Sequence, residues 1–170
     1  VTQSNYEING INSILYTNID NKLSGIFSSE IPDQKISGSI LSDNQNITLR
    51  SKVIIDMNDT FNYGQYLDFS GKEEFSAKMN INDTVSLELT SNLQNTLIRS
   101  EIDDLRKDIS SNLKTTIQIS DMSQPTYYVE NNKFKAFIDN ENNGYFYLGK
   151  KFNNDIKDIQ TDDGFYIFLE

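Results

Sequence analysis

Apolar and polar residues alternate with a period of two along several stretches of this chain. The alternation is clearest over residues 47–57, 74–81, 84–93 and 111–120. Neighbouring side chains of a strand point to opposite faces, so each stretch presents one face to a core and the other to water. Antiparallel sheets show this pattern, whereas parallel sheets covered on both sides have unbroken apolar runs. The alternation therefore predicts a mainly β protein built of one-sided, antiparallel strands.

The connections between these stretches are short and rich in Asn, Asp or Gly, which are the usual residues of tight turns. Further strands are expected at 35–41, 66–69, 133–139, 145–152 and 165–169. Ser51 and Ile54 interrupt the alternation of 47–57, which indicates a bulge there. We expect residues 1–170 to form a single domain, an antiparallel meander of about eight to ten strands arranged as a curved sheet, a sandwich or an open barrel.

Residues 5–27 fit two periodicities. Ile8, Ile11, Leu15 and Ile19 would share one face of a helix, whereas Tyr6, Ile8, Ile14 and Tyr16 fit strand alternation. Gly10 and the many asparagines disfavour a helix. We expect a short helix or an irregular lead-in, followed by a strand around 23–28.

The period changes to that of a helix in the middle of the chain. The apolar residues there are Leu97, Ile98, Ile102, Leu105, Ile109 and Leu113. Ser100 and Asp103 have the spacing of a capping box. One internal helix is predicted over 101–109. Its apolar seam is too short for a safe coiled-coil prediction, so covering one face of the sheet is its expected role.

The chain has no cysteine and no histidine, and its formal net charge is −10. These absences exclude disulfides, Ser-His-Asp and Cys-His catalysis, and ordinary zinc sites. Lys and Arg are scattered, so we expect no nucleic-acid partner. We also expect no enzyme activity, because histidine, the usual acid–base residue, is missing, and we expect no cofactor and no metal site. Direct membrane insertion is not expected either, because no apolar run approaches the length of a membrane span.

Acidic residues form two groups that are candidate calcium loops. The segment 139–144 resembles the front of such a loop, but Lys150 stands where a bidentate Glu is required. A hairpin turn is the better interpretation. The second group, expected to be a solvated loop, contains Asp155, Asp158, Asp162 and Asp163.

Four strand carboxylates and three N-glycosylation sequons are further candidate sites. Glycoside hydrolysis needs two carboxylates flanking a cleft. The residues considered were Asp56, Asp68, Glu74 and Glu88, of which Asp56, Glu74 and Glu88 are expected on the solvated faces of their strands. Sequons begin at Asn46, Asn58 and Asn82, where exposed turns or strand starts are predicted.

Aromatic residues are concentrated near the C-terminus. None occurs from Ser76 to Thr126, whereas many follow Thr126. Tyrosines on a sheet can stack on sugars or anchor a protein partner. The candidates for partner or glycan binding are Tyr127, Tyr128, Tyr145 and Tyr147. Both faces of 145–148 are apolar, which also describes a strand buried between two layers.

These patterns lead to two functional hypotheses. The first is a non-enzymatic structural or binding module outside the cytoplasm, such as a surface filament subunit, an adhesin domain or a virion component. Such a module would be at the cell surface, in the periplasm or in a virion. It would bind a protein partner, another copy of itself or a glycan. The alternative is a carrier of lipid or another apolar ligand, held in a groove of the β-sheet.

Overall fold

The computed structural model describes residues 12–17, 22–31, 34–43, 46–60, 67–100, 103–141, 143–148 and 167–169. Strands dominate this part of the chain. They are β1 (Asn12–Thr17), β2 (Leu23–Ile31), β3 (Gln34–Ser42), β4 (Ile47–Asp56), β5 (Leu67–Ser70), β6 (Lys72–Ile81), β7 (Val85–Ser91), β8 (Leu97–Ser100), β9 (Thr115–Ser120), β10 (Thr126–Glu130), β11 (Phe134–Ile138), β12 (Gly144–Leu148) and β13 (Ile167–Leu169). A four-residue helix α1 (Met57–Thr60) and a 3-10 turn η2 (Asp103–Leu105) complete the elements.

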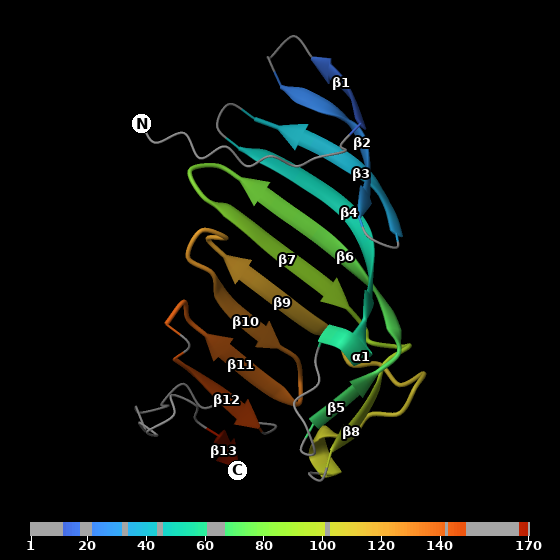
Figure 1. The fold of residues 1–170 in the computed structure, drawn as a ribbon, viewed down its shortest axis with the longest axis vertical. Helices are drawn as coiled ribbons and strands as arrows, with labels where there is room; N and C mark the ends of the chain where they lie inside the picture. The colour runs from blue at the N-terminus through green and yellow to red at the C-terminus, as the bar shows by residue number, and fades with distance from the viewer. Residues whose placement is uncertain are drawn as a thin grey trace.

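The strands form one large meander (Figure 1). Eleven of them make a single sheet in the order β1-β2-β3-β4-β6-β7-β9-β10-β11-β12-β13, and β5 pairs with β8 in a separate two-stranded sheet. All neighbours are antiparallel except β12 and β13, which are parallel. The edge strands β1 and β13 lie at opposite ends of the molecule. The predicted antiparallel meander is therefore confirmed, in the form of an open sheet.

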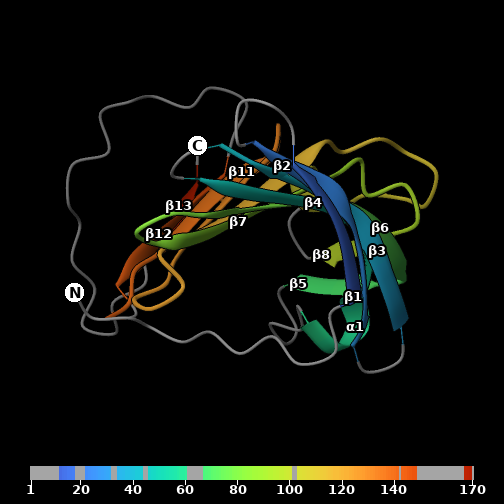
Figure 2. The ribbon, with the colours of Figure 1, turned by 90° about the horizontal axis from the view of Figure 1, so that it is seen from above.

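The two faces of the large sheet differ in chemistry. Figure 2 shows the sheet bent, with α1, β5 and β8 on the inner side of the bend. We call this side the inner face and the opposite side the outer face. Strand register places Leu49, Met79, Leu87 and Ile119 on the inner face, and Arg50, Lys78, Glu88 and Gln118 on the outer face. The alternation of the sequence is thus the alternation of the two faces.

The buried core lies at one end of the inner face. Phe75 of β6 is completely buried there, and Ile98 of β8 covers this end of the sheet with only 1% of its surface exposed. The other buried members of the cluster are Met57, Phe69, Leu89, Leu93, Leu105, Leu113, Ile117 and Phe134. The β5–β8 pair, α1 and η2 therefore close one end of the bent sheet by burying apolar side chains against it.

The described connections at the end of the sheet away from the core share one turn motif. Each is stabilised by an Asp or Asn whose side-chain oxygen accepts a backbone N–H two or three residues later, as in an Asx turn. Asp43 accepts from Asn46, Asn82 from Thr84, Asp121 from Ser123, and Asp139 from Glu141, at 2.9–3.1 Å. The hairpin turn predicted at 139–144 is confirmed, and its first carboxylate is used to form the turn.

The helix predicted over 101–109 is wrong. The described part of this region holds the end of β8, the turn η2 and an isolated bridge between Ile98 and Lys107. Each of these two residues donates its backbone N–H to the other's carbonyl, at 2.9 and 3.1 Å. Ile109, which the helical pattern counted as apolar core, is 57% exposed. Distant backbone pairing has overridden a local spacing that only resembled a helix.

Two further expectations need correction. Residues 12–17, expected in a helix or irregular lead-in, form strand β1, so the alternating interpretation of Ile14 and Tyr16 was the better one. The bulge expected in 47–57 is absent, because β4 pairs with β6 residue by residue from Ile47 to Asp56. Ile54 breaks the alternation for another reason: it lies on the outer face and is 52% exposed. Tyr6 and Ile8 lie outside the described residues.

Candidate functional site

An unbroken apolar row crosses the inner face. Direct register partners on seven consecutive strands of the sheet, β3 to β11, make up this inner row: Ile40, Leu49, Met79, Leu87, Ile119, Tyr127 and Ile138. Six of them are aliphatic. A row of this kind is continuous because cross-strand partners lie about 5 Å apart on the same face.

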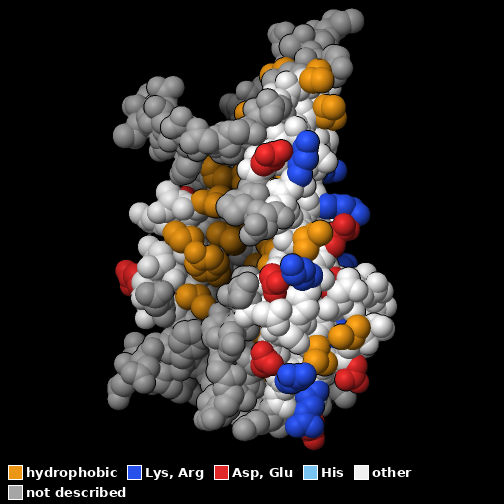
Figure 3. All heavy atoms as spheres, turned by 45° about the vertical axis from the view of Figure 1, so that its right-hand side comes forward, with side chains coloured by type: hydrophobic (Ala, Val, Ile, Leu, Met, Phe, Trp, Pro, Cys, Tyr) orange, Lys and Arg blue, Asp and Glu red, His pale blue; other side chains and the backbone are white. Residues whose placement is uncertain are grey.

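The inner row is only partly covered. β5, β8 and η2 bury the end of the inner face that carries Phe75, whereas the side chains of the row are half-buried or exposed. At the end with the Asx turns, Ile47 is 40%, Tyr127 41% and Met122 43% exposed, whereas Val85 is buried. Figure 3 shows hydrophobic side chains gathered in a recess at the left, with charged side chains to the right of it. The inner face thus forms an apolar trough that is closed at one end.

The rim of the trough at its open end is acidic. Its described connections carry Asp43, Asp83, Asp121, Asp139 and Glu141. The pKa of Asp121 is held below its ordinary value, chiefly because the Ser123 side chain and backbone donate hydrogen bonds to its carboxylate. An apolar surface with such a rim disfavours ligands that carry a negative charge at this end.

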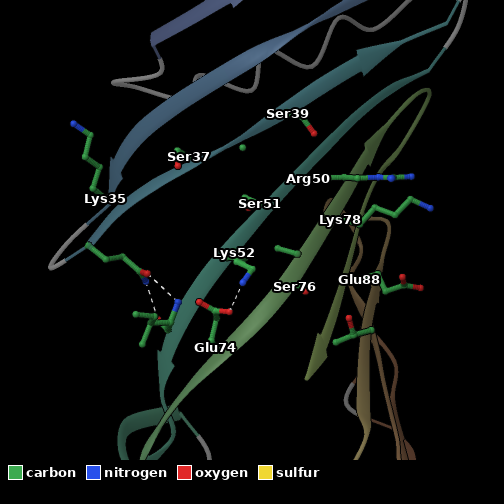
Figure 4. Close-up of a pocket in the computed structure, with 15 residues that line it drawn as sticks. Lys35, Ser37, Ser39, Arg50, Ser51, Lys52, Glu74, Ser76, Lys78 and Glu88 are labelled. Atoms are coloured by element: carbon green, nitrogen blue, oxygen red, sulfur yellow. Dashed lines mark hydrogen bonds and ion pairs between the residues drawn. The ribbon is translucent and has the colours of Figure 1, made fainter. Parts of the chain in front are cut away.

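The outer face holds a second candidate site, a hollow of about 830 Å³ over β3, β4, β6 and β7. Its floor and walls contain four cationic side chains (Lys35, Arg50, Lys52, Lys78), two carboxylates (Glu74, Glu88) and the hydroxyls of Ser37, Ser39, Ser76 and Thr90. Figure 4 shows these side chains rising from neighbouring strands. The hollow has an excess of positive charge in a chain whose net charge is −10.

Two contacts shape one end of this hollow. Lys52 Nζ lies 2.7 Å from Glu74 Oε1, and both side chains are largely exposed. The backbone pairing of β3 with β4 ends at Gly38 and Ser51. Beyond this point, the side chain of Gln34 bonds to the backbone of β4 in place of a strand partner. Its amide nitrogen donates to the carbonyl of Ile54 (2.8 Å), and its amide oxygen accepts the N–H of Ile54 (2.9 Å). The two strands separate here, with a side chain bridging them.

The four tyrosines predicted to bind a partner do not lie on one surface. Tyr127 is on the inner face, between Ile119 and Ile138 in register. Tyr128 and Tyr145 are on the outer face on either side of Phe137. Tyr147 is the register partner of Lys135, and its side chain lies outside the described residues.

The outer-face aromatic residues are engaged with neighbouring groups. The rings of Phe137 and Tyr145 stack with centroids 5.7 Å apart. Burial raises the pKa of the Tyr128 hydroxyl, and neighbouring Glu130 adds to this. Lys135 in turn lies 2.7 Å from Glu130 and lowers its pKa. Packing and local pairing therefore account for these rings, and their binding role stays a prediction.

The carboxylates weighed for glycoside hydrolysis are each engaged by a neighbour. Asp56 is paired with Lys72 and Asp68 with Arg99, each at 3.7 Å, while Glu74 has Lys52. Glu88 accepts a hydrogen bond from the Gln118 amide at 3.2 Å. Glu74 and Glu88 lie on the outer, solvated face as predicted.

The remaining predicted sites have mixed outcomes. The sequon residues Asn46, Asn58 and Asn82 are exposed, as expected. The group Asp155, Asp158, Asp162 and Asp163 lies outside the described residues. Within the described part of the chain, no three acidic side chains come together as a metal site would require. Nor does any helix there have the length and hydropathy to cross a membrane.

Comparison of the chain with models of protein families, with curated proteins and with solved structures finds no match. The two candidate sites therefore have to be judged on their own geometry. Sequence reasoning anticipated an aliphatic inner face but missed the cationic hollow. The missed signal was the pair Arg50 and Lys52 on one face of β4, which the register of β4 with β6 brings next to Lys78.

Proposed function

We propose that the protein binds an apolar ligand of the acyl-chain class in the trough of the inner face. The observation that supports this most directly is the inner row, which spans seven strands and stays partly exposed because β5, β8 and η2 bury only the other end of the face. Leaving so much contiguous apolar surface accessible costs free energy, and monomeric proteins seldom do so without a binding role.

The lining indicates what kind of apolar ligand would fit. Leu49, Met79, Leu87 and Ile119 are flexible or branched aliphatic side chains that pack well against a methylene chain. The acidic rim would repel an anionic headgroup lying in the open end. A neutral or zwitterionic lipid is therefore the favoured ligand, with its chain along the inner row and its headgroup near the Asx turns.

Titration with fluorescent lysophosphatidylcholine tests this proposal. We expect saturable binding at micromolar concentration or tighter, weakened about tenfold or more in Leu87→Gln, because burying an amide against an alkyl chain costs free energy. Ser86→Gln places the same side chain on the opposite face and should bind like the unchanged protein. If Leu87→Gln unfolds by circular dichroism, Tyr127→Gln at the exposed rim replaces it. No saturable binding, or equal loss in Ser86→Gln, contradicts the proposal.

A second role is favoured by a different observation, an apolar patch on the outer face beside edge strand β1. Ile14 and Ile26 are direct register partners and are 56% and 59% exposed, with Leu41 at 47% nearby. Such a patch next to an open strand edge suits assembly with a protein partner or another copy, as expected of an extracytoplasmic structural module.

Sedimentation velocity tests the self-association form of this second role. The protein should form oligomers at about 100 μM that Ile26→Lys disrupts, because a charge at the centre of the patch would be desolvated on association. Ile109→Lys, at an equally exposed position away from the patch, should leave the oligomers intact. A strict monomer at this concentration would rule out self-association through this patch.

A further inference from the structure

The outer-face hollow contains two cations, Arg50 and Lys78, that form no ion pair with the described residues. Arg50 and Lys78 are direct register partners on β4 and β6, and Figure 4 shows them extending side by side in the same direction. Among the described residues, no carboxylate oxygen lies within 4.0 Å of either side chain. Like charges directly opposite each other destabilise a sheet, so this arrangement has a cost that a bound anion would remove.

The acidic residues nearest to this pair are already engaged. Glu88, the register partner of Lys78, keeps its charge, but its carboxylate accepts a hydrogen bond from the Gln118 amide and lies more than 4.0 Å from the Lys78 ammonium. Glu74 lies against Lys52 at 2.7 Å, and Figure 4 shows the two side chains pointing toward one another. On the other side of Arg50, the register partner is Ser39, which carries no charge. The Arg50 guanidinium lines the hollow, and none of its donors has a partner among the described residues.

Hydroxyl groups surround the two cations. Ser37, Ser39, Ser76 and Thr90 line the hollow from β3, β6 and β7, and none of these hydroxyls has a hydrogen-bond partner within the described residues. From β3 to β7 the hollow spans three strand spacings, or about 14 Å. That width is several times what a simple inorganic anion needs, and a surface of free hydroxyls suits a ligand that carries many hydroxyls of its own.

We propose that this hollow binds an acidic oligosaccharide, with a sugar carboxylate on Arg50 and Lys78 and the sugar hydroxyls on the surrounding Ser and Thr side chains. The planar guanidinium fork of Arg50 matches a carboxylate in bidentate geometry, and Lys78 adds a second charge at the same place. The site is on the opposite face from the lipid trough, so it does not depend on the function proposed above.

Isothermal titration with trigalacturonic acid tests the proposal at low salt. We expect measurable binding that Arg50→Gln and Lys78→Gln each weaken about tenfold, as the loss of a charge-assisted hydrogen bond implies. Ser39→Ala combined with Ser76→Ala should weaken it several-fold. Lys114→Gln removes an exposed cation outside the hollow and should leave the affinity unchanged. Circular dichroism of each variant should match that of the unchanged protein, which checks that the fold is intact.

Two matched ligands make the result decisive. The methyl ester of trigalacturonic acid keeps the hydroxyls and removes the charge, so it should not bind measurably. Inorganic sulfate keeps the charge alone and should bind far more weakly than the oligosaccharide. Equal binding of the ester overturns the role of the two cations, equal binding of sulfate overturns the oligosaccharide, and unchanged affinity in the Arg50 and Lys78 variants overturns the site.

Discussion

Glu73 and Lys107 are both buried, and Thr96 lies between them and bonds to each. The Thr96 hydroxyl donates to Glu73 Oε2 at 3.2 Å, and its carbonyl accepts from Lys107 Nζ at 2.7 Å. Glu73 also accepts from the Ser91 hydroxyl and the backbone N–H of Asn95, both at 2.7 Å. The charged side chains of Glu73 and Lys107 thus hold the connection between β7 and β8 in place. This connection leads into β8, which buries the core end of the inner face.

Substitution of Glu73 by Gln should therefore lower the free energy of unfolding by about 2 kcal/mol, because buried Lys107 then loses the larger of the two negative charges that stabilise it, the other being Asp108. Glu74→Gln, one residue away on the outer face, removes only an exposed ion pair and should cost less than about 0.5 kcal/mol. Urea unfolding followed by circular dichroism measures both. A similar decrease in the free energy of unfolding in both variants would show that the Glu73 carboxylate does not stabilise the connection between β7 and β8.

The two hydrogen bonds between the Gln34 side chain and the Ile54 backbone should stabilise β4 where it separates from β3. Gln34→Ala removes both bonds to the Ile54 backbone and should cost about 1 kcal/mol. Hydrogen exchange of the Ile54 amide should accelerate more than that of its neighbours in β4. Gln124→Ala, in an exposed turn, should leave stability within about 0.5 kcal/mol. An unchanged Ile54 exchange rate would mean that the bridge does not protect this amide in solution.

Gly71 joins β5 to β6 in a conformation that side chains disfavour. Its φ is +118°, and an added Cβ would meet the carbonyl of Asn95. Its own carbonyl accepts the N–H of Met57 at 2.8 Å, where α1 begins. Gly71→Ala should lower the free energy of unfolding by about 1–3 kcal/mol. Ser70→Ala serves as the control in the same urea titration. Equal stability of the two variants would contradict the strain argument.

Acid should destabilise the protein through Glu130. Its pKa lies below the ordinary value of 4.5, chiefly because Lys135 donates a hydrogen bond to it. The unfolded chain then binds a proton more readily than the folded one as the pH falls below 4.5. The stability that the pair contributes is present above this pH and is lost as the pH drops through the folded pKa. Glu130→Gln should flatten this part of the pH–stability curve, and an unchanged slope would show that the pair contributes nothing.

Much of the sheet could be predicted from local pattern. Strands β4 and β6 were expected at 47–57 and 74–81 and lie at Ile47–Asp56 and Lys72–Ile81. Alternation is a property of each strand alone, and Asx turns are set by residues within three positions of one another. Both are therefore visible in the sequence without knowledge of the partner strands.

The wrong helix prediction and the missed hollow both concern contacts that a local periodicity does not encode. Ile98 pairs with Lys107 through the backbone, and the burial of Lys107 depends on Thr96. Neither contact can be predicted from a local periodicity of the sequence. The outer-face hollow follows the same rule, because Arg50 and Lys78 become neighbours only through the register of β4 with β6. The exposure of the inner row likewise depends on how far β5 and β8 extend over it.

The nearly sequential order of the strands has a consequence for how the chain acquires its structure. Among the described strands, only β5 and β8 lie outside the large sheet, so most strands of that sheet pair with the one made just before them. Loops closed in this way are short, which keeps the entropic barrier to each pairing low. We expect the sheet to grow from one edge during synthesis, each new hairpin docking on a template already in place.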